Sequence, residues 1–157
     1  DRECKHLEAL QHYYKENNLK KCYETLDIYT SLYTTELGEL LEKHWQKIVE
    51  ECESYALKGK ISDIKNTLGL LVTLESRVDK IGDLFRLAFH IRVKTYLSKR
   101  SFKNAQQLIY SYIDTFGLDY EIKILMKKYE QKTKHKLAIT HDIPTQRDSW
   151  LFSEFIQ

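Results

Sequence analysis

Three tyrosines, Tyr13, Tyr55 and Tyr96, lie 42 and 41 residues apart in this chain of 157 residues. Each is followed by a short polar stretch and then by apolar or small residues at the sixth, ninth and thirteenth positions. These are Leu19, Cys22 and Leu26, then Ile61, Ile64 and Leu68, then Phe102, Ala105 and Ile109. Steps of three and four residues between apolar side chains are typical of amphipathic helices. A register repeated three times predicts three copies of one helix–turn–helix unit.

The polar stretch after each tyrosine separates two predicted helices. The first helices are expected at 2–17, 36–58 and 78–99, and the second helices at 19–33, 61–76 and 101–116. Only one proline and five glycines interrupt the chain, which favours long helices over many short strands. Because one helix pair cannot cover its own apolar face, neighbouring pairs are expected to stack.

Residues that favour helix ends stand at the predicted breaks. Ser62 and Ser101 can accept hydrogen bonds from the free N–H groups at the starts of second helices. Asn17 and Gly59 tolerate the left-handed conformation that often ends a helix, and Gly117 can end the third unit in the same way. Local chemistry therefore agrees with the repeat, and an antiparallel bundle with coincidental spacing is the alternative.

The repeated positions resemble those of the tetratricopeptide repeat. In the third copy, the family's aromatic, tyrosine, aromatic, small and large apolar positions are occupied by Phe89, Tyr96, Phe102, Ala105 and Ile109. The resemblance implies an all-α fold, a right-handed α-solenoid of about three helix-turn-helix (TPR-like) repeats with a C-terminal capping helix. It also implies a scaffold that holds protein partners.

The chain departs from the family in its period and in two signature residues. The family repeats about every 34 residues, whereas the spacing here is 41 to 42 residues. Leu10, Cys52 and Val93 stand where the family's first helix usually has glycine, and the usual closing proline is missing. These differences indicate a long-period variant with extended first helices.

The repeat domain is expected to span residues 1–138. Its units cover 2–33, 36–76 and 78–116, with a partial fourth copy at 119–138. Residues 139–157 are expected to form a connector and a short amphipathic docking helix. The chain begins at Asp1 and enters helix-like sequence at once, so we read it as a piece of a longer protein.

In the family, side chains of the first helices line a concave groove that accepts a peptide or a helix of a partner protein. Carried over by register, the resemblance implies a partner-binding set made of Gln11, Tyr14, Lys15, Gln46, Glu53, His90 and Lys94. Amide, acidic and basic groups above an apolar floor suit a peptide chain. The alternative is that these residues lie on a solvated helix face.

Charge is distributed unevenly along the chain. Residues 1–85 hold 12 Lys and Arg against 16 Asp and Glu, a net charge of −4, whereas residues 86–136 hold 12 against 4, a net charge of +8. Interleaved with tyrosines, the basic half could bind phosphates and stack on bases, so nucleic-acid binding is the alternative function. A solvated basic face that keeps the chain soluble is the simpler interpretation.

The C-terminal segment 148–156 is rich in large apolar side chains, among them Trp150, Phe152 and Phe155. Such a segment is too apolar for a free surface tail, and we expect it to dock. It could cap the helices of its own chain, or it could mediate self-association by docking on a second copy.

The chain contains no motif with the spacing of a catalytic or metal-binding site. Its six histidines form no H-E-x-x-H frame, and a Gly-rich phosphate loop is absent. Cys4, Cys22 and Cys52 share no C-x-x-C spacing, so they are expected to be free thiols that pack in helices. We therefore expect no enzyme, no metal and no cofactor, in a cytoplasmic chain without a membrane span.

Overall fold

The computed structural model describes residues 2–140, 142–148, 150–153 and 156, without the side chains of Glu3 and Phe152. Over these residues the chain consists of helices and loops and contains no strand, which confirms the all-α prediction. No helix in this part of the chain is long and apolar enough to span a membrane. Three of the helices, α1 (Arg2–Lys15), α3 (Glu36–Leu57) and α5 (Val78–Ser98), lie close to the predicted first helices.

The second helices are shorter than predicted, except for α6 (Phe102–Phe116). Helix α2 (Leu19–Ile28) ends at Tyr29, whose ring stacks on His6 of α1 with 3.5 Å between ring centroids. Helix α4 (Ile61–Leu68) ends at Gly69, which adopts a φ of 54°. The prediction of α-helix to residues 33 and 76 is therefore wrong, because these stretches form the 3-10 helices η1 (Thr30–Thr34), η2 (Gly69–Thr73) and η3 (Glu75–Arg77).

Helices α1, α3 and α5 all end in the same kind of turn, whose left-handed residue lies four positions after the repeated tyrosine. Asn17, Gly59 and Arg100 have φ values of 58°, 67° and 58°. The next N–H donates to the tyrosine carbonyl, with N···O distances of 2.9 Å for Asn18 to Tyr13, 2.9 Å for Lys60 to Tyr55 and 2.8 Å for Ser101 to Tyr96. This is the Schellman arrangement, in which a left-handed residue allows the free carbonyls of the last turn to be paired. The tyrosine register of the sequence thus marks a repeated backbone geometry.

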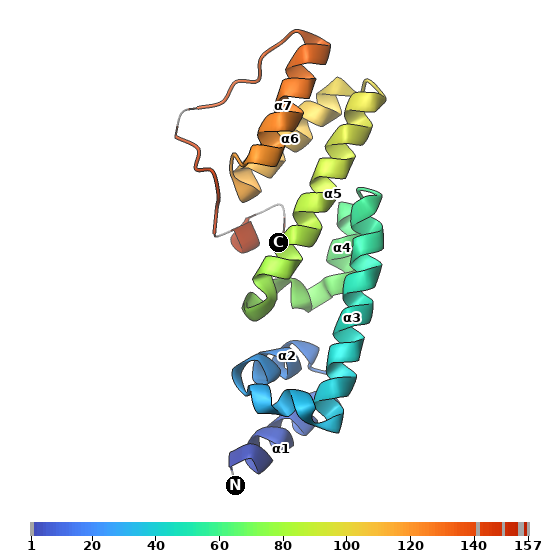
Figure 1. Ribbon diagram of the computed structural model, residues 1–157, viewed down its shortest axis with the longest axis vertical. Coiled ribbons are helices and arrows are strands. Elements are labelled where there is room, and N and C mark those ends of the chain that lie inside the picture. Colours follow the sequence, from blue (N-terminus) through green and yellow to red (C-terminus); the bar gives the residue numbers. More distant parts are fainter. Residues whose placement is uncertain (1, 141, 149, 154–155, 157) are drawn as a thin grey trace.

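Helix pairs follow one another along the length of the molecule (Figure 1). The pairs α1–α2, α3–α4 and α5–α6 are in contact within themselves, and α3 packs along α5. A further helix, α7 (Tyr120–Thr133), packs on both α5 and α6. The turn at Gly59 lies close to α5, since a Cβ at this position would lie 3.0 Å from the Arg92 backbone nitrogen.

One continuous apolar core runs through the helix pairs, from Leu10 in α1 to Ile156 near the C-terminus. Cys22 and Cys52 belong to this core, and burial raises the pKa of both thiols to about 11. Cys4 is exposed, so the packing role predicted for the cysteines is wrong at this position. All three thiols are free.

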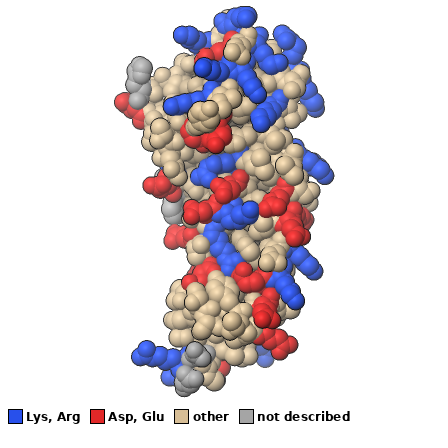
Figure 2. All heavy atoms as spheres, viewed as in Figure 1, with Lys and Arg blue, Asp and Glu red and all other residues tan. Residues whose placement is uncertain are grey.

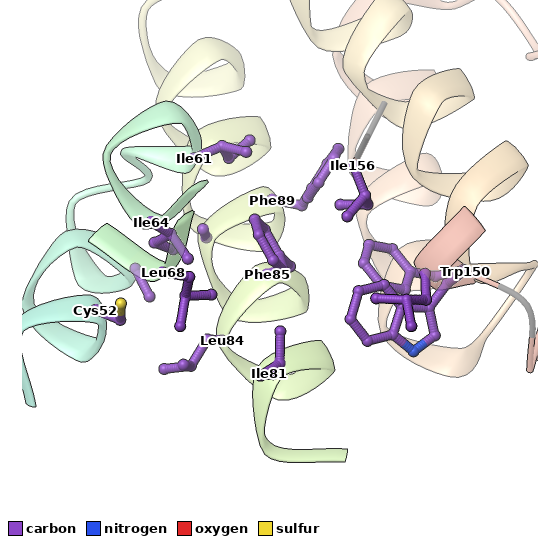
Figure 3. Close-up of a cluster of buried hydrophobic side chains, with 14 of the residues drawn as sticks. Cys52, Ile61, Ile64, Leu68, Ile81, Leu84, Phe85, Phe89, Trp150 and Ile156 are labelled. Atoms are coloured by element: carbon purple, nitrogen blue, oxygen red, sulfur yellow. The ribbon is translucent and has the colours of Figure 1, made fainter. Parts of the chain in front are cut away.

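The C-terminal segment folds back onto its own chain. The N–H of Leu118 donates to the carbonyl of Pro144 over 2.8 Å, and the N–H of Arg147 donates to the carbonyl of Phe116 over 2.9 Å. Trp150 is only 4% exposed, and its ring faces that of Phe85, with ring centroids 6.1 Å apart (Figure 3). It also packs on Phe116, with ring centroids 5.5 Å apart.

The docked segment differs from the expected α-helix. Its described part forms a three-residue 3-10 helix, η4 (Trp150–Phe152). Phe155 and the side chain of Phe152, which were predicted to take part in docking, lie outside the described residues.

Candidate functional site

A groove with an apolar wall runs between α1 and α3. It consists of two adjoining hollows of about 400 and 650 Å³, which share Leu40. Side chains one helical turn apart form its walls, because residues three or four positions apart lie on one face of a helix. They are Leu7, Gln11 and Tyr14 on α1 and Leu37, Leu40, His44 and Lys47 on α3.

The groove leaves large apolar side chains open to solvent. Tyr14 is 43% exposed and Leu40 is 49% exposed, although both lie beside buried core residues such as Leu41. The 3-10 helix η1 packs against both α1 and α3, and Thr35, the residue that follows it, lines the smaller hollow. A third hollow of about 590 Å³ continues the groove past Leu19 toward α4.

Among the described residues, the charged side chains that line the larger hollow are two lysines. Lys43, His44 and Lys47 of α3 line it, and no carboxylate does so among the residues that the structure describes. Glu36 lies at the other end of the groove, in the smaller hollow. Glu16 and Glu51 line the third hollow, so the positive charge of Lys43 and Lys47 is confined to the middle of the groove, where it favours an acidic side chain of an occupant.

Of the seven residues predicted to bind a partner, Gln11 and Tyr14 line this groove. Lys15 is exposed at the end of α1, and Gln46 is exposed on α3, but neither is among the described lining residues. The register carried over from the family thus locates the α1 wall and misses the α3 wall. The sequence analysis did not include Leu40, His44 and Lys47 of the α3 wall. The adjacent apolar residues Leu40 and Leu41 widen the apolar face of α3 and could have indicated this wall.

The remaining three predicted residues lie away from the groove. Glu53 pairs with Lys80 of α5, with 3.0 Å between Oε1 and Nζ. His90 packs against the Tyr112 ring at 5.0 Å, and its Nε2 is buried without a hydrogen-bond partner in the described part of the chain. Burial lowers the pKa of His90, an effect that nearby Lys94 and Arg86 reinforce and that Asp119 and Glu121 oppose.

Lys94, the last of the seven, is exposed in the basic half of the chain. Figure 2 shows Lys and Arg gathered at the end of the molecule formed by the C-terminal ends of α5 and α7. Two of the tyrosines interleaved with these charges, Tyr112 and Tyr129, are buried and cannot stack on bases. The hydroxyl of Tyr110 accepts the N–H of Ala138 over 3.1 Å, and Tyr120 alone is widely exposed among the five described tyrosines of residues 96–129.

Arg77 forms a polar cluster that the sequence did not reveal. Its Nε and Nη2 donate to the two carboxylate oxygens of Asp27 over 3.0 and 2.8 Å, and Nη2 also lies 2.5 Å from Glu42. The guanidinium lies 4.8 Å from the ring centroids of both Tyr23 and Trp45. The cluster joins η3 to α2 and α3. Asp27 and Arg77 are 50 residues apart, so no local pattern could have predicted the pair.

Hydrogen bonds control the ionisation of Asp27. Burial raises the pKa of this carboxyl, but hydrogen bonds from Arg77, Ser76 and Tyr33 outweigh burial and bring its pKa below the usual value. The pKa of Tyr33 is raised to about 12 by burial and by its hydrogen bond to Asp27. The cluster is therefore charged at neutral pH and holds three elements together.

Within the described residues, no group of three or more His, Cys, Asp and Glu side chains could hold a metal ion. Comparisons of this chain with protein-family models, curated proteins and solved structures found no match. The geometry of the groove is therefore the basis on which a function can be proposed.

Proposed function

We propose that this chain is a protein-interaction scaffold, a right-handed α-solenoid of long TPR-like repeats that holds a segment of a partner protein between α1 and α3. The three Schellman turns at the tyrosine register support the repeat. The side-by-side packing of α3 with α5 and of α5 with α7 supports a stack in which the first helices share one face. In repeat proteins of this kind, such a face is an extended binding surface.

The apolar groove is the observation on which the proposal depends. Tyr14 and Leu40 remain about half exposed although they border the core. Burying such side chains against a partner stabilises a complex, and each large apolar side chain contributes on the order of 1.5–3 kcal/mol when fully buried. A groove between two helices suits an amphipathic helix, which would place apolar residues at helical spacing against Tyr14, Leu37 and Leu40.

Charge defines the partner segment further. Lys43 and Lys47 line the middle of the groove, so the segment is expected to have Asp or Glu along one edge of its apolar face. This occupant is an acidic amphipathic helix. A basic amphipathic helix of the same apolar content should bind more weakly, because its charges would face lysines.

Fluorescence anisotropy with two labelled synthetic helices tests this proposal. The two helices share one leucine-rich apolar face and differ only in having Glu or Lys along its edge. We expect the acidic helix to bind more tightly, by about tenfold or more at low salt. We expect Leu40→Glu to abolish that binding, because a carboxylate would replace the apolar contact.

Leu57→Glu is the matched control. Leu57 lies on the same helix, is 64% exposed and is not among the groove residues. This variant should bind the acidic helix like the unchanged protein. Equal loss of binding in both variants, or equal binding of the acidic and basic helices, would rule out the groove as the site.

A further inference from the structure

A separate hollow of about 350 Å³ lies between α4 and α6, over the C-terminal half of α5. Its volume is at the lower end of the range of small-molecule sites, which is roughly 300–1,000 Å³. Polar side chains predominate in its lining, in particular Ser62, Lys65, Arg92, Tyr96, Asn104 and Gln107. The site is made by three helices and is distinct from the groove between α1 and α3.

The hollow differs in chemistry from its counterpart one unit earlier. The interval between α2 and α4 is also a hollow, but its lining combines leucines such as Leu68 with the carboxylates of Glu16 and Glu51. The hollow between α4 and α6 has no carboxylate among its described lining residues, and it holds two cationic side chains with several hydroxyl and amide groups.

Arg92 is the central group of the hollow. It is half-buried; its Nε donates to the hydroxyl of Tyr96 over 3.0 Å and its Nη1 to the carbonyl of Gly59 over 3.4 Å. The close approach of Gly59 to the Arg92 backbone fixes this part of α5.

No carboxylate lies within ion-pair distance of Arg92 in the part of the chain that the structure describes. The other two half-buried arginines of α5 and the preceding η3 are paired: Arg77 with Asp27 and Glu42, and Arg86 with Asp83. Removing a cation from water without a counter-charge costs free energy, which a bound anion would offset.

Lys65 adds a second positive charge from α4, one turn after Ser62. Helix α4 begins at Ile61, and Lys60 provides no side-chain cap for it. The N–H groups of its first turn therefore add a positive partial charge near Ser62. Asp63 is the acidic side chain of this turn, and it is not among the residues that line the hollow. Its charge, together with that of Glu51, raises the pKa of Tyr55.

We propose that this hollow binds a phosphate group, either free or at the end of a small ester. A guanidinium and an ammonium group with neighbouring hydroxyl and amide donors match the oxygens of a phosphate. Asn104 and Gln107 provide donors and acceptors for hydroxyl groups of an attached ester. The site is independent of the partner groove, so either assignment can fail alone.

Two-dimensional amide NMR of the full chain, titrated at low salt with inorganic phosphate, with glycerol 3-phosphate and with glycerol, tests the site. We expect both phosphates to shift the signals of Ser62, Asn104 and Gln107, and glycerol to leave them unchanged. Tighter binding of glycerol 3-phosphate would identify an ester as the ligand, and equal binding would identify free phosphate. Shifts spread evenly over the lysine-rich end of the molecule would overturn the proposal.

Arg92→Gln should weaken phosphate binding by about tenfold or more, because it removes a charge-assisted pair of donors. Lys94→Gln is the control, since Lys94 is exposed on the same helix and does not line the hollow. Lys65→Gln, on a different helix, gives an independent result should Arg92→Gln fail to fold. Unchanged affinity in both hollow variants, or equal weakening in the Lys94 variant, would contradict the assignment.

Discussion

At the scale of single residues, Arg77 connects parts of the chain that are distant in sequence. Its side chain is only 11% exposed, and it contacts Asp27 of α2 and both Glu42 and Trp45 of α3. A surface ion pair contributes little to stability, but a buried charge that loses its partner is costly. The stability of the first two helix pairs should therefore depend on this one side chain.

Arg77→Met retains much of the side-chain length and removes the charge, leaving Asp27 without its main partner. We expect it to lower the free energy of unfolding by about 3 kcal/mol. Urea denaturation followed by circular dichroism measures this value. Lys80→Gln breaks the exposed pair with Glu53 and should cost less than about 1 kcal/mol. A loss of the same size in both variants would show that the Arg77 cluster has no special role.

The lowered pKa of Asp27 also predicts how stability depends on pH. A carboxyl with a depressed pKa in the folded state contributes stability that is fully present above its ordinary pKa, here 3.8. This contribution is lost as the pH falls through the lower pKa of the folded state. Denaturation at a series of pH values from 6 to 2.5 should show stability falling below about pH 4, with a shallower fall in Asp27→Asn. Identical acid profiles would contradict a charged Asp27 in the cluster.

At the scale of helices and turns, most boundaries follow from residues within a few positions. Asn17 and Gly59 were predicted to adopt left-handed conformations, and their φ values confirm this. Arg100 occupies the same position in the third copy, although arginine does not favour this conformation. The sequence therefore located that turn by its register and not by its residue type.

The second helices show where local prediction fails. Apolar residues continue at helical spacing beyond Ile28 and Leu68, but the chain bends into 3-10 helices there. Stacking of Tyr29 on His6 and the positive φ of Gly69 accompany these bends. The stacking partner lies in a different helix, so α2 ends for a reason that its own sequence does not contain.

The docked C-terminal segment depends on a glycine of α5. A Cβ at Gly82 would lie 3.1 Å from the Trp150 ring and 3.0 Å from Nη1 of Arg86. Gly82→Val should therefore displace Trp150 into solvent, with a red shift of tryptophan emission and stronger quenching by acrylamide. Asp79→Val, at an exposed position of the same helix, is the control. Because Trp45 also fluoresces, comparison with Trp150→Phe shows which part of the emission comes from Trp150. Unchanged emission in Gly82→Val would contradict the docking geometry.

At the scale of the whole molecule, the C-terminal segment decides whether the α5–α6 face is open. Phe85 and Phe116 are buried in part by Trp150 of the same chain (Figure 3). The structure thus shows docking on the same chain, which was one of the two expected modes. Removal of the segment would expose these rings, and exposed apolar patches promote association.

Sedimentation velocity separates the two modes. We expect the full chain to be a monomer and a chain that ends at residue 144 to self-associate, since its α5–α6 face is uncovered. A full-length dimer that becomes a monomer on truncation would instead indicate that the segment docks on a second copy. The degree of self-association of Trp150→Ala in the full chain should lie between those of the full and the truncated chain. Its value shows whether the Trp150 ring alone keeps the α5–α6 face covered.

The sequence by itself determined the helices, the three turns after the tyrosines and the α1 wall of the groove, because these depend on hydrogen bonds and side-chain spacings within about one helical turn. Tertiary structure decided which faces are covered. It brought Glu53 against Lys80 of α5 and His90 against Tyr112 of α6, and it assembled the Arg77 cluster from residues up to 50 positions apart. It also placed Trp150 on the rings of its own chain. Such contacts depend on how rigid helices pack in space, and the periodicity of one helix contains no information about its neighbour.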